Sequence, residues 1–123
     1  MRVKRIRSAE KMPIEMRLFK RQHFREIFGN DWEAVLEKSP LLAPGEEVLL
    51  CEIDGLVAGW VQFQRNTYFV SFRNFAVLPL FRGRRVARRL LAELRDIAIN
   101  HHHGLIASGE KPSDIKLMYL KSL

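Results

Sequence analysis

The stretch Val77–Leu91 constrains the fold more than any other part of this 123-residue sequence. An apolar run stops at Pro79, and a short turn that contains Gly83 follows it. A helical pattern then begins, because apolar residues recur at spacings of three and four. These residues are Val86, Leu90, Leu91, Leu94, Ile97 and Ala98. The pattern predicts a strand, a tight turn and a helix, with backbone N–H groups free at the helix start in a way that suits a phosphate.

Arginines crowd the turn and the first two turns of this helix. They are Arg82, Arg84, Arg85, Arg88 and Arg89. A helix N-terminus carries partial positive charge, so these cations are repelled by the helix dipole and by one another. Local conflicts of this kind tend to mark functional sites. A bound polyanion would relieve the conflict; the alternative interpretation is a solvated basic face on an amphipathic helix.

The same residues resemble the signature of the GCN5-related N-acetyltransferase (GNAT) superfamily, V-x-P-x-x-R-G-x-G-x-G/A, which leads from the fourth strand into the third helix. The matching residues are Val77, Pro79, Arg82, Gly83 and Ala87. Arg85 stands where the family has its middle glycine. In the family this loop binds the pyrophosphate of acetyl-CoA on backbone amides. The Arg85 side chain either blocks that approach or points outward and adds a phosphate contact.

Composition and charge narrow the class of protein. A chain of 123 residues is expected to be a single domain over residues 1–123. The formal net charge of +7 favours acidic partners, which include CoA phosphates, nucleic acid and acidic protein surfaces. No apolar run approaches the length of a membrane span. The single Cys51 cannot form an internal disulfide, so a reducing cytoplasm is the expected compartment.

The first two-thirds of the chain predict strands and helices in an order typical of that superfamily. A strand is expected over Arg2–Ala9, followed by a helix from about Pro13 to Gly29 and a second short helix that carries Trp32. Two strands then follow, Glu47–Ile53 and Leu56–Gln64. Asp54-Gly55 between them is a strong signal for a two-residue hairpin, and Gly59 suggests a bulge or close packing.

The segment Thr67–Val77 predicts a third consecutive antiparallel strand, central and covered on both faces. Strict alternation places Tyr68, Val70, Phe72 and Ala76 on one face. It places Phe69, Ser71, Arg73, Phe75 and Val77 on the other. A charged Arg73 in such a strand needs a partner or a water-filled cleft. No Asp or Glu occurs between Thr67 and Leu80, so this strand supplies no carboxylate base.

Past the arginine-rich helix, Leu105–Ser108 predicts a short strand parallel to the preceding one. Glu110–Asp114 resembles a helix start, and a short helix is expected to follow. Met118–Leu123 resembles the closing pattern of the family's fourth helix, whose tyrosine often protonates the departing CoA thiolate; Tyr119 matches it by position. The family's last two strands are missing from this pattern. The edge near Leu105 is then either bare, or covered by a second copy or another partner.

Several side chains have two interpretations. The resemblance implies that the region of the first two helices helps to form the acceptor wall, with Phe28 and Trp32 as candidates; two such aromatics are more often plain core. His23 is interpreted as a packed or partly exposed histidine, with a catalytic role as the minor alternative. The run His101–His103 has poor geometry for one metal site, and no metal ligand is assigned.

These observations predict an α/β fold (α+β mixed sheet) of the GNAT type with helices on both faces, truncated at the C-terminus. The resemblance implies transfer of an acetyl group from acetyl-CoA to an amine acceptor, a protein among the candidates, with Tyr119 as general acid. The residues expected to bind acetyl-CoA are Phe75, Ala76, Val77, Arg82, Gly83, Arg84, Arg85, Val86, Ala87 and Arg88. The alternative is a catalytically inactive module of this fold, suited to a viral or mobile-element effector, that docks on an acidic protein. Nucleic-acid binding is a third possibility, but no aromatic stacking pattern accompanies the arginines.

Overall fold

The described residues form six strands and three α-helices. A computed structural model describes residues 1–38, 42–67, 69–102, 105–108 and 116–119. The strands within them are β1 Arg2–Ile6, β2 Glu46–Ile53, β3 Leu56–Arg65, β4 Val70–Val77, β5 Leu105–Ser108 and β6 Lys116–Tyr119. The helices are α1 Ile14–Phe28, α2 Trp32–Lys38 and α3 Val86–His102, with 3-10 turns η1 Ala9–Lys11, η2 Gly29–Asp31 and η3 Pro79–Phe81.

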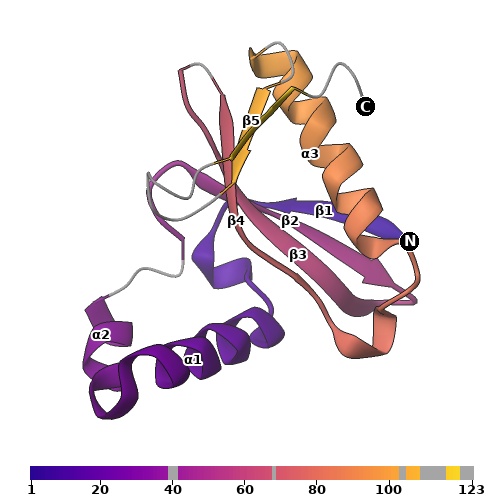
Figure 1. Ribbon diagram of the computed structural model, residues 1–123. Coiled ribbons are helices and arrows are strands. Elements are labelled where there is room, and N and C mark those ends of the chain that lie inside the picture. The colour runs from indigo at the N-terminus through magenta and orange to yellow at the C-terminus, as the bar shows by residue number, and fades with distance from the viewer. Residues whose placement is uncertain (39–41, 68, 103–104, 109–115, 120–123) are drawn as a thin grey trace.

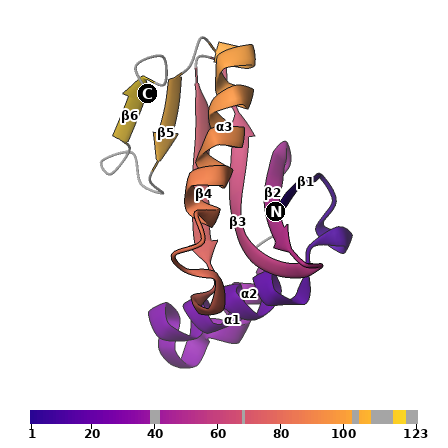
Figure 2. The same ribbon diagram turned by 90° about the vertical axis from the view of Figure 1, so that its right-hand side faces the viewer.

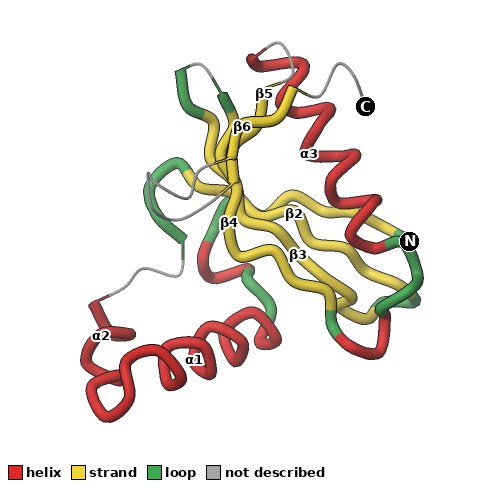
Figure 3. The backbone as a smooth tube through the Cα atoms, viewed as in Figure 1, coloured by secondary structure: helices red, strands yellow, loops and turns green. Residues whose placement is uncertain are grey.

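The strands form one mixed sheet in the order β1-β2-β3-β4-β5-β6 (Figure 1). Neighbours from β1 to β4 are antiparallel, and β4 pairs in parallel with β5. The tube in Figure 3 shows α3 leading from the end of β4 back toward β5, which is the crossover that a parallel pair requires. The antiparallel centre, the edge position of the first strand and the parallel crossover are confirmed. None of the helices within the described residues is long and apolar enough to cross a membrane.

Helices cover both faces of this sheet, as Figure 2 shows. Alternating side chains of β2 separate the two cores. Leu49 and Cys51 pack with the buried face of α3, whereas Val48 and Leu50 pack with Met16 of α1 on the opposite face. Val86, Leu90, Leu94 and Ala98 form that buried face of α3, and Ile97 packs against it, which confirms the helical spacing found in the sequence. Leu91, which was predicted on the same face, is exposed. The sheet is therefore the wall that separates α1 from α3.

The hairpin between β2 and β3 turns at Asp54 and Gly55, as predicted. Their φ angles are 52° and 79°, the left-handed values that a two-residue hairpin turn requires. The expected irregularity at Gly59 is also present, because the pairing register shifts between Cys51 and Glu52 beside it. A Cβ atom on Gly59 would lie 2.7 Å from the Ala76 carbonyl oxygen and 2.9 Å from Val86 Cγ1. Glycine is thus needed where the start of α3 packs onto β3 and β4.

A bulge in β4 overturns the predicted assignment of its two faces. Trp60 pairs with Ala76 and Gln62 pairs with Arg73, so one residue of β3 faces two of β4. Asn74 is one of these two and has φ of 55°. The extra residue reverses the alternation. As a result Val70, Phe72, Phe75 and Val77 all pack toward the α3 core, while Ala76 packs toward the α1 core.

Two expectations for the C-terminal part are wrong. Residues 116–119 were expected to extend a helix, but they form β6, which pairs antiparallel with β5 from Leu105↔Tyr119 to Ser108↔Lys116. The edge of β5 is therefore covered within the chain, and the reason given for a second copy there no longer applies. The predicted helix start at Glu110–Asp114 lies outside the described residues, as does His103.

The strand β4 was expected to begin at Thr67, but it begins at Val70.

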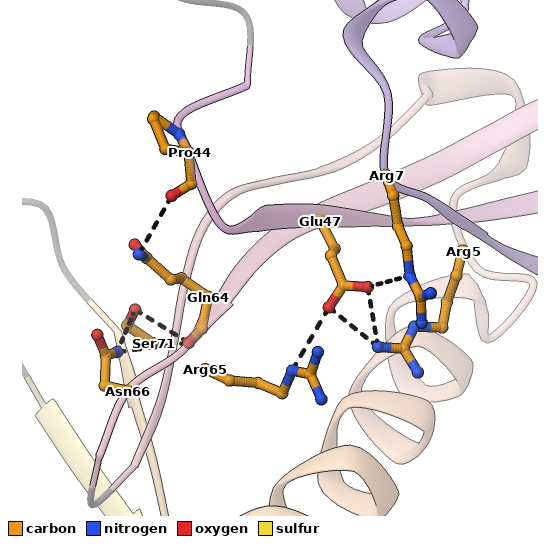
Figure 4. Close-up of polar contacts among 8 residues, drawn as sticks. All are labelled: Arg5, Arg7, Pro44, Glu47, Gln64, Arg65, Asn66 and Ser71. Carbon is orange, nitrogen blue, oxygen red and sulfur yellow. Dashed lines mark hydrogen bonds and ion pairs between the residues drawn. The ribbon is translucent and has the colours of Figure 1, made fainter.

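A buried acid secures the edge strand β1. Glu47 accepts hydrogen bonds from Arg5 Nη2 at 2.9 and 3.0 Å and from Arg7 Nε at 2.6 Å, and Arg65 Nε lies 3.7 Å away (Figure 4). Burial raises the pKa of Glu47, but the bonds from Arg5 and Arg7 and the nearby positive charge outweigh burial and lower that pKa. Part of the chain's positive charge is thus structural and is not available to a ligand.

Candidate functional site

The turn between β4 and α3 has the backbone that the sequence predicted. Pro79 lies in the first turn of η3, and Gly83 and Arg85 follow with φ of 80° and 63°. Arg89 N donates to the Arg85 carbonyl at 3.0 Å, so Arg85 directly precedes the helix. An α-helix has no internal acceptor for the amides of its first turn. The amides of Val86–Arg88 are therefore available at the mouth of this turn.

A hollow of about 440 Å³ opens at this helix start. Its lining contains Phe81 and seven of the ten residues predicted to bind the donor. These seven are Val77, Arg82, Gly83, Arg85, Val86, Ala87 and Arg88. Arg85 is exposed and lines the hollow without filling it. Phe75, Ala76 and Arg84, which were predicted with them, do not line this hollow.

The five arginines of the turn divide into two groups. Arg84 lies over the Phe81 ring at 5.9 Å, and Arg89 pairs with Glu93 at 3.1 Å. Arg82, Arg85 and Arg88 line the hollow. Among the described residues no carboxylate forms an ion pair with these three, and α3 has no acidic residue in its first turn. The hollow thus combines exposed guanidinium groups with free backbone N–H groups, a set of donors suited to phosphate oxygens.

Strand β5 pairs with the first part of β4 only. Their pairing spans Val70–Phe72 of β4 and Ile106–Ser108 of β5. For the rest of β4, Arg73–Val77, the only strand partner among the described residues is β3. Phe75–Val77 therefore belong to the part of β4 with which β5 does not pair.

A second hollow, of about 400 Å³, lies between α1 and β4. Its apolar lining consists of Phe19, Phe24, Ile27, Phe28 and Phe75. Its polar lining consists of Lys20, His23, Gln62, Arg73 and Asn74. Among the described residues it has no acidic lining residue. Strand β4 contributes to both hollows, since Phe75 lines this one and Val77 lines the first.

An ion pair between Arg73, which lines the second hollow and is 40% exposed, and the buried Glu46 supports the polar wall of this hollow. Arg73 donates from Nε and Nη2 to the two carboxylate oxygens of Glu46, both at 2.7 Å, and the Ala43 amide donates to Glu46 at 2.8 Å. Burial raises the pKa of Glu46, but the hydrogen bonds from Arg73 and Ala43, with the charges of Arg73 and Lys20, outweigh it and lower that pKa. Glu46 is thus an ionised structural partner of Arg73, which confirms that Arg73 needed one.

Lys20 of α1 lines the opposite wall of the hollow, and the charges of Arg73 and Glu46 both act on it. Burial lowers the pKa of Lys20, and the nearby Arg73 charge lowers it further, while Glu46 acts in the opposite direction. Both cations line the hollow, but the side chain of Glu46 is only 4% exposed. Among the described lining residues, the side chains of lysine, arginine and the acids are therefore represented by Lys20 and Arg73, both cations.

A model of the "Acetyltransferase (GNAT) family" matches residues 12–113, which is most of the sequence and includes both hollows. The chain belongs to the acetyltransferase (GNAT) family. The expected fold and enzyme class are thereby confirmed. A search of curated proteins finds no match to the sequence of this GNAT enzyme.

Solved structures agree with the fold of this GNAT chain. Tetrahymena GCN5 matches with a TM-score of 0.63 at 12% identity, over 90% of this chain and 71% of that one. An integron cassette protein from the mobile metagenome of V. cholerae matches with a TM-score of 0.62 at 17% identity, over 92% and 78%. The aminoglycoside N-acetyltransferase AAC(6')-Iy in complex with CoA matches with a TM-score of 0.55 at 21% identity, over 92% and 81%. At these identities the likeness concerns the fold.

The other residues considered for the site of the GNAT chain lie partly in the second hollow and partly elsewhere. Phe28 lines the second hollow, as a wall candidate should, and so does His23. Trp32 lies elsewhere, under the guanidinium groups of Arg21 and Arg25 at 5.2 and 5.0 Å. Tyr119 lies on β6 opposite Leu105 instead of on a helix. Its role as general acid stays a prediction.

Sequence reasoning missed four polar residues of the second hollow and its wall. They are Lys20, Glu46, Gln62 and Asn74. Asn74 donates from its side chain to Gln62 Oε1 and so ties the bulge of β4 to β3. Arg73 was the available signal, because a charge inside an apolar strand pattern needs a nearby acid. Nothing in the sequence indicated that this acid would be Glu46 or that Lys20 of α1 would lie beside the pair.

Proposed function

We propose that this GNAT enzyme transfers an acetyl group from acetyl-CoA to an amine, with the hollow at the start of α3 as the binding site for the donor's phosphates. The observation that carries this proposal is the group of three exposed arginines, Arg82, Arg85 and Arg88, around the free amides of the first helical turn. Such a helix start repels its own cations unless an anion is bound. The family and the chemistry of this turn point to the same ligand.

Six residues are proposed to hold the phosphates of the donor. The amides of Gly83 and of Val86–Arg88 donate to phosphate oxygens, and Arg82, Arg85 and Arg88 add charge. Phe75–Val77 is the part of β4 proposed to face the acetyl end, with Ala76 between them. The Leu78 amide is excluded as a donor to the acetyl oxygen, because it donates to the Ala58 carbonyl at 2.8 Å. The hydrogen bond to the acetyl oxygen is therefore assigned to a backbone amide within Phe75–Val77, where it would polarise the acetyl carbonyl.

Acetyl-CoA supplies an activated acetyl thioester, from which the acetyl group passes to the amine nitrogen as the carbon–sulfur bond breaks. The chain's own contribution is positioning and proton transfer. Tyr119 is proposed to donate its phenolic proton to the leaving sulfur. Glu46 is a poor base, since both of its carboxylate oxygens are bound by Arg73. The amine is therefore proposed to lose its proton to water.

The proposal also covers the compartment, the domain organisation and the oligomeric state of the protein. The free Cys51 is buried and its pKa is raised by burial, which suits a structural thiol in a reducing cytoplasm. We propose a single domain over residues 1–123 that needs no nucleic-acid partner. Covering of β5 by β6 favours a protein that works without a second copy, although a homodimer through another surface is compatible with the fold.

A substitution at Tyr119 tests the chemistry. Tyr119→Phe should lower turnover with acetyl-CoA and an amine by about tenfold or more, since general acid catalysis contributes at least that much. The affinity for acetyl-CoA should stay unchanged, as measured by calorimetry on the same preparation. Unchanged turnover would remove Tyr119 from the mechanism.

Mass spectrometry of the protein purified from cells separates the enzyme from the inactive binding module. Co-purified CoA is expected if the hollow binds the donor. A module that docks on an acidic protein through Arg82, Arg85 and Arg88 would carry no CoA and would gain no thermal stability from acetyl-CoA.

A further inference from the structure

We propose that the second hollow, between α1 and β4, binds the uncharged aromatic ring of a small molecule. Among the described residues it shares no lining residue with the hollow at the start of α3, so this inference does not depend on the proposed acetyl transfer. The lining combines cations that already have partners in the chain with exposed apolar side chains and with phenylalanine rings that contact other rings.

The two cations of the lining are engaged within the chain. Arg73 is hydrogen-bonded to both carboxylate oxygens of Glu46. Lys20 lies over the Phe24 ring, with its Nζ atom 5.4 Å from the ring centre. Because each cation is already stabilised in this way, the hollow can bind a ligand without forming an ion pair to it. The recognition of a ligand therefore falls to the uncharged part of the lining.

The apolar side chains of the lining are unusually exposed. Phe19, Ile27 and Phe28 are 40%, 57% and 42% exposed. They line a hollow of about 400 Å³, which is near the lower end of the range for small-molecule sites and suits one ring with a short substituent. An apolar group placed in the hollow would remove part of this surface from water, which is favourable.

Each phenylalanine among the described lining residues contacts another aromatic ring. The pairs are Phe19 with Trp60 at 5.5 Å, Phe24 with Phe28 at 5.3 Å and Phe75 with Phe72 at 6.3 Å. The first and third pairs are T-shaped, and the rings of the second are tilted by 55°. These contacts restrict the rings of the wall before a ligand arrives. A further ring would gain contacts of the same kind, which add about twofold to tenfold in affinity beyond the apolar area that is covered.

Amide side chains provide an uncharged polar part of the lining. Gln62 of β3 and Asn74 of β4 both line the hollow, and Asn74 donates a hydrogen bond from its side chain to Gln62 Oε1. Amide groups donate and accept hydrogen bonds without carrying charge. The hollow thus suits an aromatic ring with an uncharged polar substituent, such as a carboxamide.

A small molecule suits this hollow better than a second copy of the chain. The formal net charge is +7, so two copies repel each other. Sedimentation velocity tests this point, and a monomer is expected. A dimer that dissociates when phenylacetamide is added would show that another copy fills the hollow, and it would overturn the proposal.

Two uncharged amides test the preference for an aromatic ring. Phenylacetamide and cyclohexylacetamide differ only in their rings, and each is titrated into the full chain without acetyl-CoA while chemical shifts are followed by NMR. We expect phenylacetamide to bind about fivefold more tightly, as contacts between aromatic rings predict. Equal binding of the two amides, or binding of neither up to its solubility limit, would overturn the proposal.

Matched substitutions locate the binding site. Phe28→Leu removes one ring of the lining but keeps the position apolar, so the preference for phenylacetamide should fall to about twofold or less. Phe69→Leu, at a half-buried position outside the lining, should leave the preference unchanged. Phe24→Leu is the second variant if Phe28→Leu unfolds. A preference that survives both Phe28→Leu and Phe24→Leu would overturn the assignment to this hollow.

Charged counterparts of the probe test whether the ligand is uncharged. We expect 3-phenylpropionate and 2-phenylethylamine to bind no more tightly than phenylacetamide, because the hollow forms no ion pair with its ligand. Binding of either one that is tenfold tighter would overturn this part of the proposal. Since acetyl-CoA is absent throughout, these outcomes are independent of whether the start of α3 binds the donor.

Discussion

The two hollows along β4 hold positive charge in opposite ways. At the start of α3, Arg82, Arg85 and Arg88 stand exposed around free backbone amides, and no carboxylate of the described chain balances them. Between α1 and β4, Arg73 is fixed by two hydrogen bonds to a buried glutamate. The first arrangement costs folding free energy and leaves a demand for a ligand, whereas the second stabilises the fold and gives the hollow a fixed shape. The arginines proposed to bind a cofactor thus differ from the arginine that supports a pocket wall in whether a carboxylate of the described chain pairs with them.

The largest expected effect comes from breaking the balanced pair. Glu46→Gln should lower the free energy of unfolding by about 2–3 kcal/mol, because it leaves the Arg73 guanidinium beside Lys20 without its carboxylate. Urea unfolding measures the change, and Glu33→Gln at an exposed position is the matched control. A loss no greater than that of the control would mean that the pair contributes nothing to stability.

The pH dependence of stability in the same variant tests whether Glu46 is ionised in the folded protein. Because the pKa of Glu46 is lowered in the folded state from its ordinary 4.5, its contribution is fully present above about pH 4.5. That contribution is lost as pH falls through the lowered folded value. The stability difference between the unmodified protein and Glu46→Gln should therefore be constant between about pH 7 and pH 5 and shrink in more acidic solution. A difference that grows on acidification would contradict the assignment.

A smaller effect is expected from removing the unbalanced charge. Arg82→Ala combined with Arg88→Ala should weaken acetyl-CoA binding by about tenfold, since two charge-assisted contacts to phosphate are lost. The control is Arg84→Ala combined with Arg89→Ala, which removes equal charge from the same turn but away from the hollow. Calorimetry should show less than a threefold change for the control. Equal losses in both pairs would mean that only the general charge of the helix start matters.

The smallest effect concerns the left-handed residue before α3. Arg85→Gly should raise the free energy of unfolding by about 0.5 kcal/mol, because relief of the left-handed strain slightly exceeds the added flexibility of the unfolded chain. Arg88→Gly, inside the helix, should have the opposite sign. Urea unfolding of both variants gives the comparison. If Arg85→Gly tightened acetyl-CoA binding tenfold, the arginine would be an obstruction in the donor site.

Features encoded in one short stretch could be predicted from the sequence. The turn from Pro79 to Arg88 and the Asp54-Gly55 hairpin each depend on local backbone preferences, and the structure has both. The faces of β4 could not be predicted, because strict alternation does not reveal the extra residue at Asn74. The helix expected near Tyr119 was wrong because pairing with β5 gives the segment 116–119 a strand conformation that its local signals did not favour.

The second hollow depends on contacts between distant segments. Lys20 comes from α1, Glu46 from β2 and Arg73 from β4, and no periodic pattern connects them. The sequence showed only that Arg73 would need a partner. The hollow proposed to bind the donor is therefore readable from a contiguous motif, whereas the second hollow becomes visible only once the helices are placed on the sheet.

Calorimetric titration of acetyl-CoA into the unmodified protein, repeated in excess inorganic pyrophosphate, tests whether the start of α3 binds the donor. We expect one molecule to bind per chain and its apparent affinity to fall in pyrophosphate, because both anions would occupy the amides and arginines at the start of α3. Absence of binding, or binding that pyrophosphate leaves unchanged, would contradict it.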